Sequence, residues 1–259
     1  MSARQFVGWA ALAMLSPSIP ALGGRPLTID DAEPVAPRQF QIEAGVGYLG
    51  DQAITHFDFP VALTYGLLPR VEIGAGFGGQ IEERKETLGA ERAVTDVGDL
   101  TLGTKIKLFT AEQAWADQAT ALTVKLPTAS CATRLGSGGT DFDLTWIVSK
   151  PITAHGSGHF NLGYTWTGNC HRGRRYNDIL HYGFAADYQL AKTLQLVAEV
   201  FANTPVANAA ETGVRFNGGV RWQVLESLVL DAAIGTGGLR DPAEITATVG
   251  LTWTFGLMQ

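Results

Sequence analysis

Apolar and polar residues alternate with a period of two along most of this chain. The pattern is clearest in Glu244–Phe255, where every second residue is apolar and the residues between are polar or glycine. Successive side chains of a strand point to opposite faces, so each such segment has one apolar and one polar face. About ten residues with this pattern suffice for a tilted strand that crosses a bilayer. We therefore expect an all-β chain that folds as a transmembrane antiparallel up-and-down β-barrel.

Twelve segments carry the pattern, and the connections between them mostly alternate between short and long. We expect strands at about 39–49, 56–66, 71–81, 97–109, 119–127, 141–150, 158–167, 179–190, 193–203, 214–224, 228–236 and 244–255. The short connections are Leu67–Arg70, Thr153–Ser157, Ala191–Lys192 and Leu225–Ser227, and the long polar ones are Glu82–Asp96, Thr128–Thr140, Gly168–Asp178 and Thr204–Gly213. Bacterial barrels have short periplasmic turns and longer external loops, so an even strand count leaves both termini in the periplasm. Thr110–Gln118 is a longer periplasmic connection with room for a helical turn, and the external loop Gly50–Thr55 is brief.

Aromatic residues on the apolar face support the same arrangement. With the strands oriented by the loop rule, one group lies near the periplasmic ends: Phe40, Tyr65, Phe109, Phe160, Tyr188, Trp222 and Phe255. A second group lies near the external ends: Tyr48, Phe57, Phe77, Phe142, Trp166, Tyr182 and Phe216. Membrane interfaces select two such girdles because an amphipathic ring is most stable at headgroup depth.

The composition agrees with a membrane barrel and argues against several other classes of protein. The chain is 46% hydrophobic and only 17% charged, yet no interior stretch approaches the ~20 apolar residues of a transmembrane helix. The net charge of −6 leaves no basic stripe to neutralise phosphates, so we expect no nucleic-acid partner.

The N-terminus has the pattern of a secretory signal. Arg4 precedes an apolar run from Phe6 to Leu15, and Ala21-Leu22-Gly23 is a small-x-small cleavage site. We expect a signal peptide at 1–23, a periplasmic N-terminal segment at 24–38 and an outer-membrane barrel at 39–259. Arg25–Arg38 holds three prolines and no strand pattern, so it is either a periplasmic tail, which we favour, or a plug that folds into the lumen.

The polar face of the strands collects charged residues, which must face the lumen because a charge on the lipid face costs about 2–4 kcal/mol near the midplane. The lumen-lining candidates are Glu43, Asp58, Glu72, Asp99, Lys105, Lys107, Lys125, Asp141, Asp143, Asp187, Arg215, Arg221 and Asp231, joined by Glu199 and Glu244. Acids and bases are mixed, so ion pairs that brace the wall are favoured over a charge filter. Glu72, Asp99, Lys105 and Lys125 are the candidates for central positions, where they would set selectivity if they line a constriction.

No enzyme motif is found, and no metal or cofactor is expected. The histidines form no HExxH and no paired metal spacing. His155 and His159 lie with Ser157 at a predicted periplasmic turn, the wrong side for a surface lipid hydrolase. Cys131 and Cys170 fall in two outer loops, where a disulfide bridge and two unpaired thiols are both open. The basic cluster His171–Arg175 in an outer loop indicates contact with anionic lipopolysaccharide.

Four motifs are spread over the chain: Arg25–Ala32 with Arg38–Glu43, Tyr65–Gly74, Val97–Lys105, and Lys125–Thr128 with Leu135–Asp141. They resemble segments of the outer-membrane family named for the meta-cleavage pathway of phenol degradation. The second departs from the family in Leu68-Pro69, where a more polar turn is common. The resemblance implies an outer-membrane barrel that transports aromatic or other hydrophobic compounds.

Together these features predict a bacterial outer-membrane channel for passive uptake of small molecules. Its expected partners are outer-membrane lipid, lipopolysaccharide, a small-molecule solute and, during biogenesis, the barrel-assembly machinery. The alternative is a non-conducting barrel that acts through its outer loops.

Overall fold

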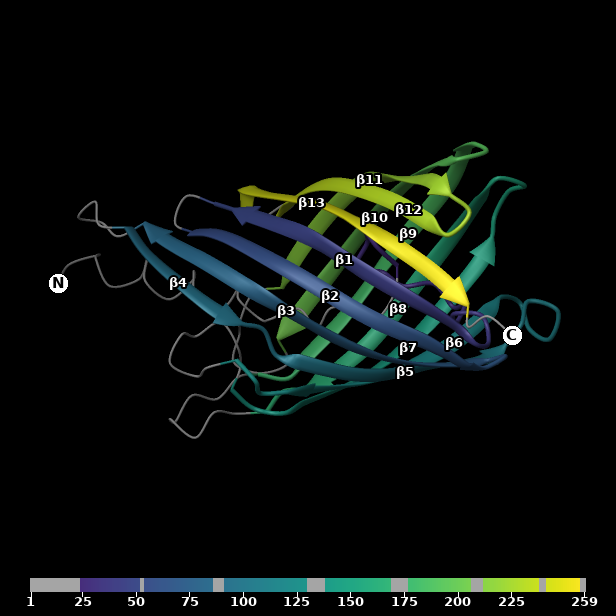
Figure 1. Cartoon of the computed structure of the whole chain (residues 1–259), viewed down its shortest axis with the longest axis horizontal. Coiled ribbons are helices and arrows are strands. Elements are labelled where there is room, and N and C mark those ends of the chain that lie inside the picture. The colour runs from purple at the N-terminus through teal and green to yellow at the C-terminus, as the bar shows by residue number, and fades with distance from the viewer. Residues whose placement is uncertain are drawn as a thin grey trace.

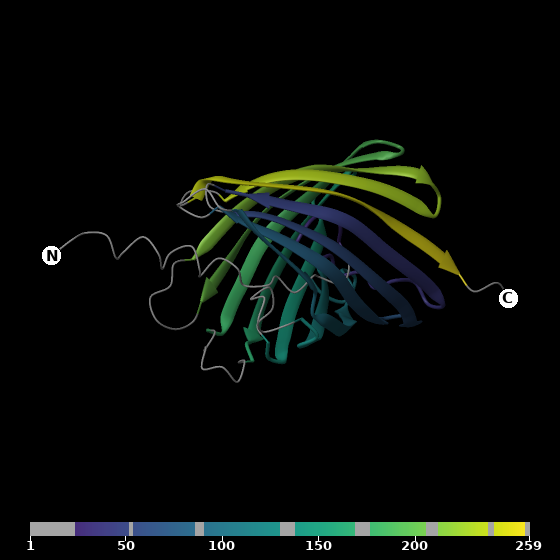
Figure 2. The same ribbon diagram turned by 60° about the vertical axis from the view of Figure 1, so that its left-hand side comes forward.

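The computed structural model describes residues 24–51, 54–85, 91–129, 138–168, 177–205, 212–237 and 241–256. In these residues thirteen strands form one antiparallel sheet that closes on itself (Figures 1 and 2). The strands are β1 (Gln39–Gly50), β2 (Ile54–Leu68), β3 (Val71–Lys85), β4 (Glu91–Val97), β5 (Leu100–Phe109), β6 (Asp117–Leu126), β7 (Asp141–Pro151), β8 (Gly156–Trp166), β9 (Ile179–Ala191), β10 (Leu194–Pro205), β11 (Gly213–Leu225), β12 (Leu228–Gly237) and β13 (Asp241–Gly256). The predicted signal peptide, residues 1–23, lies outside the described residues.

The thirteen strands occupy twelve positions around the barrel, as the alternation predicts, because β4 and β5 lie end to end in one position beside β3. Both pair with β3: β4 pairs with its second half from Gly79 onward, and β5 with its first half up to Gly76. Every other strand pairs with its sequence neighbours. The barrel closes where β1 pairs with β13, from Gln39 opposite Gly256 to Gly50 opposite Ile245.

The position shared by β4 and β5 is interrupted at Gly98 and Asp99, which connect the two strands. The Gly98 N–H donates to the Gly78 carbonyl of β3, and the Thr128 hydroxyl donates to the Gly98 carbonyl at 2.8 Å. The Asp99 carboxylate accepts the Ala129 N–H at 2.9 Å. These contacts pair the Gly98 N–H and carbonyl at the point where the pairing register along β3 changes between β4 and β5.

The prediction of a long polar loop at 82–96 was wrong. β3 continues to Lys85 and β4 begins at Glu91, so β3 and β4 form a hairpin extension seen at the left of Figure 1. Beyond Ile81 most residues of the extension are polar or charged, so period-two alternation of hydrophobicity was too weak to reveal it. The longer connection at 110–116 does contain a single turn, in which the Ala114 N–H donates to the Thr110 carbonyl at 3.0 Å.

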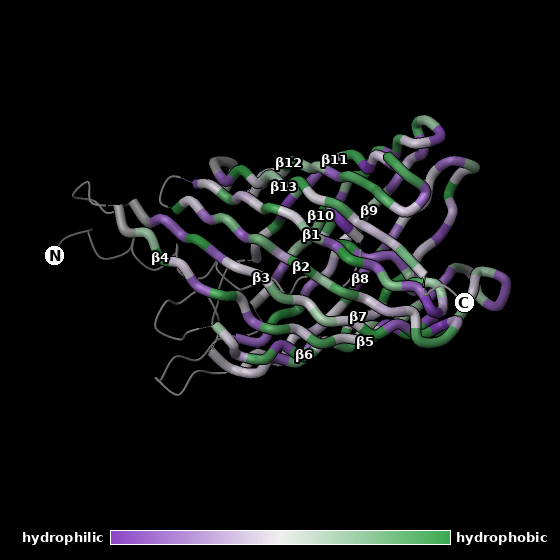
Figure 3. Tube along the Cα trace, in the orientation of Figure 1, coloured by the Kyte–Doolittle hydropathy of each residue, from purple (hydrophilic) through white to green (hydrophobic). Residues whose placement is uncertain are grey.

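Large apolar side chains cover the outer surface. Val249 is 57% exposed and Leu63 is 45% exposed, although both lie within long strands. Figure 3 shows hydrophobic and hydrophilic residues alternating along the strands. A surface of this kind is stable in hydrocarbon and would aggregate in water. In the described residues no helix is long and apolar enough to cross a membrane.

Aromatic rings pack across neighbouring strands near both ends of the barrel. Phe40 contacts Tyr65 and Phe255 where β1 begins and β13 ends, with ring centroids 4.6 and 5.6 Å apart. At the other end of β1, Tyr48 packs on Phe57 at 5.3 Å. These two groups agree with the two girdles expected from the sequence.

Candidate functional site

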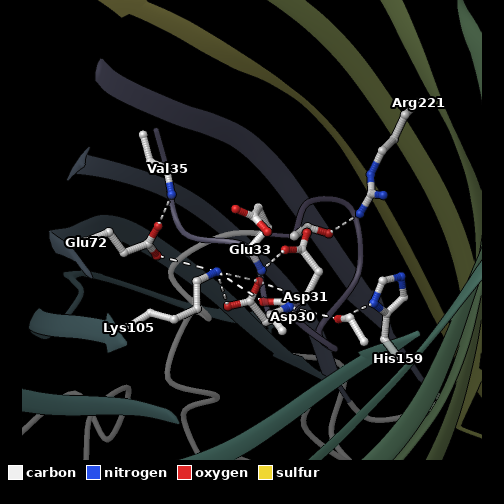
Figure 4. A network of polar contacts seen from close by, with 11 residues as sticks. Asp30, Asp31, Glu33, Val35, Glu72, Lys105, His159 and Arg221 are labelled. Atoms are coloured by element: carbon white, nitrogen blue, oxygen red, sulfur yellow. Dashed lines mark hydrogen bonds and ion pairs between the residues drawn. The ribbon is translucent and has the colours of Figure 1, made fainter. Parts of the chain in front are cut away.

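Residues 24–38 lie inside the barrel, and we call them the lumen segment. Arg38 adopts a left-handed backbone conformation with φ of 64°, and its N–H donates to the Gly66 carbonyl of β2 at 2.8 Å. This turn reverses the chain at the start of β1 and directs the preceding residues into the lumen, where Figure 4 shows their polar contacts with the wall. Of the two placements open from the sequence, the structure therefore has the plug and not the favoured tail.

Arg25 attaches the start of the lumen segment to the closing seam of the barrel. Its guanidinium lies 3.2 Å from the Asp231 carboxylate of β12 and donates to the Thr248 hydroxyl of β13 at 3.0 Å. It sits on a pair of facing glycines, Gly45 of β1 and Gly250 of β13. A Cβ at either glycine would come within 2.3 Å of a guanidinium nitrogen, so a side chain at either position would require the Arg25 guanidinium to shift.

Arg221 of β11 holds the backbone of the same end. Its guanidinium donates to the Arg25 carbonyl at 2.6 Å and to the Gly24 carbonyl at 2.7 Å. It also donates to the Gln195 side chain at 3.1 Å. Because Arg221 binds two backbone carbonyls, it fixes the path of the segment independently of the side chains that the segment carries.

Glu199 of β10 performs the complementary task with a carboxylate. It accepts the N–H groups of Thr28 and Ile29, each at 2.8 Å, and the Asn217 amide at 2.6 Å. Beside it, Leu27 and Ile29 pack in a buried apolar cluster with Ala185, Val197 and Phe201 of the wall. This cluster is an apolar area in an otherwise largely polar lumen.

Lys105 of β5 binds the middle of the segment. Its ammonium lies 3.1 Å from the Asp30 carboxylate, 3.2 Å from the Asp31 carbonyl and 3.5 Å from Glu72 of β3 (Figure 4). Glu72 in turn accepts the Val35 N–H at 2.6 Å. Burial raises the pKa of the Asp30 carboxyl well above its usual range, and the Lys105 charge acts in the opposite direction.

A chain of hydrogen bonds through three strands holds Ala32. The Ala32 N–H donates to the Ser149 hydroxyl at 2.8 Å, and that hydroxyl lies 2.8 Å from His159 Nδ1. His159 Nε2 lies 2.7 Å from the Asp187 carboxylate. The sequence predicts that His159 lies with Ser157 at a turn, whereas His159 lies in β8 and strand pairing places it opposite Ser149. Because the serine oxygen is engaged by the segment, these side chains act as an anchor.

Further contacts complete the docking of the segment. The Asn161 amide, oriented to suit its neighbours, accepts the Asp30 N–H at 2.8 Å and donates to the Asp30 carbonyl at 2.9 Å. Glu33, the most exposed acid of the segment, pairs with Lys107, which also lies 3.5 Å from Asp117. Ala32 packs on the buried Ala119 and Ile147.

Most of the remaining sequence candidates form ion pairs or hydrogen bonds with other residues of the wall. Lys125 lies 2.6 Å from Asp99 and 3.0 Å from Asp141. Asp143 accepts from Thr145 and Thr165 at 2.7 Å and lies 2.6 Å from His181 Nε2. Arg215 and Glu244 pair at 2.7 Å, Glu43 lies 3.4 Å from the Thr252 hydroxyl, and the Asp58 carboxylate lies beside Gly47.

The four residues predicted to be central therefore form two ion pairs with different third partners. Lys105 and Glu72 share the lumen segment, through Asp30, whereas Lys125 and Asp99 share Asp141 of the wall. The residues that sequence reasoning missed are those of the segment itself, chiefly Arg25, Asp30 and Glu33. A signal was present in the sequence. Residues 25–38 have no strand pattern but carry acidic and basic side chains that could pair with the bases and acids on the polar face of the strands.

Cys131, Cys170 and the basic cluster at 171–175 lie outside the described residues. Among the residues that the structure describes, no group of three or more His, Cys, Asp and Glu side chains could hold a metal ion.

A closed β-barrel with an apolar outer surface and an occupied, charged lumen belongs to the class of membrane barrels that cross the bilayer with strands. Residues 23–255 match the family described as "Putative MetA-pathway of phenol degradation". The chain belongs to this family, as the four motifs had indicated. No curated protein sequence matches this chain.

The fold is also similar to solved porins and channels. An outer-membrane channel from Pseudomonas putida F1 has a TM-score of 0.71 at 14% identity, over 87% of this chain and 98% of that chain. The NanC porin has 0.56 at 9% identity, over 82% and 98%. The KdgM porin has 0.56 at 6% identity, over 82% and 99%. At these identities the likeness establishes the fold.

Proposed function

We propose that this protein is an outer-membrane channel for small molecules whose lumen is closed by its own N-terminal segment. The observation that carries the proposal is how the lumen is filled. Eight-stranded barrels fill with wall side chains and sixteen-stranded ones hold an aqueous channel, so twelve strands leave an intermediate space. Here that space holds residues 24–38, which lead into β1 and are kept in place by non-covalent contacts.

The contacts between segment and wall are of a kind that can be reversed. They are mainly hydrogen bonds and ion pairs, such as Arg25 with Asp231 and Glu199 with two N–H groups. Withdrawal of the segment would expose a wall that water and solutes can pair with, whereas a wall-filled core could not open without unfolding. Passage is passive because the outer membrane offers no ATP.

The proposed solutes are aromatic or other hydrophobic small molecules. The family description refers to phenol degradation, and the lumen contains the apolar cluster around Val197 and Phe201. The partners follow from the location: lipid and lipopolysaccharide around the outer face, and the barrel-assembly machinery during insertion. We propose no catalytic role, since the Ser149–His159–Asp187 contacts are used to hold Ala32.

A second candidate function is a non-conducting barrel that acts through its outer loops. The occupied lumen favours it, because a segment that never leaves would seal the barrel permanently. The two candidates differ in what release of the segment should do.

Solute flux into liposomes that carry the refolded protein from residue 24 onward separates them. We expect a simple phenol to enter faster than a small sugar, and entry to rise when Lys105→Met weakens the hold on the segment. Empty liposomes and the Ala36→Ser variant, changed at an exposed side chain of the segment, serve as controls. Absence of flux in every variant, with the barrel folded, would favour the non-conducting barrel.

A further inference from the structure

Glu199 is unusual among the lumen carboxylates because of the side chains around it. On β10 it lies between Val197 and Phe201 on the same face of the strand, and both are buried with Ala185 of β9. Other lumen carboxylates, such as Asp231 and Glu72, face basic groups at ion-pairing distance. Glu199 instead accepts hydrogen bonds from neutral donors, two backbone N–H groups and the Asn217 amide.

The lumen segment occupies this place in the manner of a bound ligand. Leu27 and Ile29 supply an apolar body against Val197 and Phe201, and the Thr28 and Ile29 N–H groups supply donors to Glu199. If the segment withdraws, an apolar patch remains beside a carboxylate that has lost two of its donors. Water can then solvate the carboxylate, but the apolar patch beside it is exposed to that water, so the vacated place favours a ligand that covers the patch and donates to the carboxylate.

The chemistry of the vacated place defines what can replace the segment. An apolar ring would cover Val197, Phe201 and Ala185, and an O–H or N–H on that ring would donate to the Glu199 carboxylate. A pure hydrocarbon would leave the carboxylate without a donor, and an anion would be repelled by it. A phenol is neutral near pH 7, because its hydroxyl has a pKa of about 10.

We propose that Ala185, Val197, Glu199, Phe201 and Asn217 form a binding site for neutral phenol-like solutes, and that Leu27–Ile29 compete with the solute for it. Binding of the solute then releases the segment and opens the channel, so the transported solute is also the ligand that opens it. The inference rests on the proposed channel function, which it deepens by naming a site and a means of opening. The apparent Kd of the solute equals its intrinsic Kd divided by the fraction of protein whose site is free of the segment. A tightly docked segment therefore weakens solute binding.

The test measures affinity directly on the refolded protein in detergent, by calorimetry or ligand-observed NMR. The probes are phenol and anisole, which share the ring but differ in the hydroxyl donor. We expect phenol to bind at least about tenfold more tightly to the Leu27→Ser/Ile29→Ser variant than to the parent chain, because the competitor is weakened. In that variant, Glu199→Gln should weaken phenol binding about tenfold and leave anisole unchanged, the effect of a hydrogen bond to a charged acceptor.

Two controls keep the test independent of folding. Ala36→Ser changes an exposed side chain of the segment and should leave phenol affinity unaltered. Gly250→Ala weakens the segment by another route, since its Cβ would displace the Arg25 guanidinium, and should also raise phenol affinity. Far-UV circular dichroism and the mobility of unboiled protein in SDS gels establish that each barrel is folded.

The outcomes separate this inference from the channel function. Equal affinity for phenol and anisole would overturn the role of Glu199, and equal phenol affinity in the parent and released variants would overturn the competition. Flux that persists in liposomes without saturable binding to any variant would overturn the site and leave the channel standing. Absence of both flux and binding would overturn the channel as well.

Discussion

Replacement of Lys105 with methionine should release the lumen segment while the barrel stays closed. Lys105 is the cation nearest the middle of the segment, with its ammonium 3.1 Å from Asp30 and 3.5 Å from Glu72. Only 5% of its side chain and 8% of that of Asp30 are exposed. Methionine keeps the length and apolar stem of lysine and removes the charge, so the change tests the ion pair and not the packing.

The magnitude follows from what the change leaves behind. Loss of one partner of a buried ion pair costs about 3–5 kcal/mol, because the other charge stays in place without compensation. Asp30 belongs to the segment and can regain water by leaving the lumen. We therefore expect the ratio of released to docked segment to rise roughly a hundredfold to a few thousandfold.

Proteolysis of the segment reads this ratio. When docking and release are fast compared with cleavage, the cleavage rate follows the population of the released form. A non-specific protease should cut residues 24–36 faster in Lys105→Met than in the parent by about the factor above, with products identified by mass spectrometry. The strands of the barrel resist the protease and serve as the internal standard.

Two further results decide whether the reasoning holds. Asp30→Asn combined with Lys105→Met removes both charges of the pair, so the double variant should recover much of the docked population. Cleavage of Lys105→Met at the parental rate, with a folded barrel, would refute the claim that this ion pair holds the segment. Equal acceleration in the single and double variants would show that Lys105 acts through Glu72 instead.

Further predictions concern the seam, the wall and the outer face. Gly250→Ala should speed cleavage of the segment because its Cβ would lie 2.2 Å from Arg25, whereas Gly218→Ala, with only one atom within 4 Å, should not. If Lys125 and Asp99 brace the wall, Lys125→Met should lower the thermal unfolding temperature, and Asp99→Asn/Lys125→Met should recover part of the loss. A shift in the ion preference of the channel at unchanged stability would instead make these residues a filter. Val249→Arg should destabilise the barrel in lipid by about 2–4 kcal/mol, measured by urea titration in liposomes with Val249→Ala as control. Ser149→Ala should speed cleavage of the segment roughly fivefold by loss of one hydrogen bond, and a fluorophosphonate probe that labels Ser149 would contradict its role as an anchor.

Local pattern predicted the strands well where one face is apolar. The alternation in Glu244–Phe255 lies within β13, and that of 141–150 lies within β7. The same signal failed at 82–96, since the hairpin of β3 and β4 beyond Ile81 has little apolar face to alternate with. A strand that lacks one apolar face carries too little pattern to be distinguished from a polar loop.

The sequence alone determined the barrel, its twelve strand positions and the polar character of its inner face, because each depends on residues two apart in the chain. The place of the lumen segment was decided only by tertiary structure. Residues 24–38 have no alternation and three prolines, so nothing local distinguishes a tail from a plug. The contacts that fix the segment join residues far apart in sequence: Arg25 pairs with Asp231 across 206 positions, and Thr28 donates to Glu199 across 171. Such partners become neighbours only when the sheet closes into a barrel. Closure therefore creates the binding partners that hold residues 24–38 in the lumen.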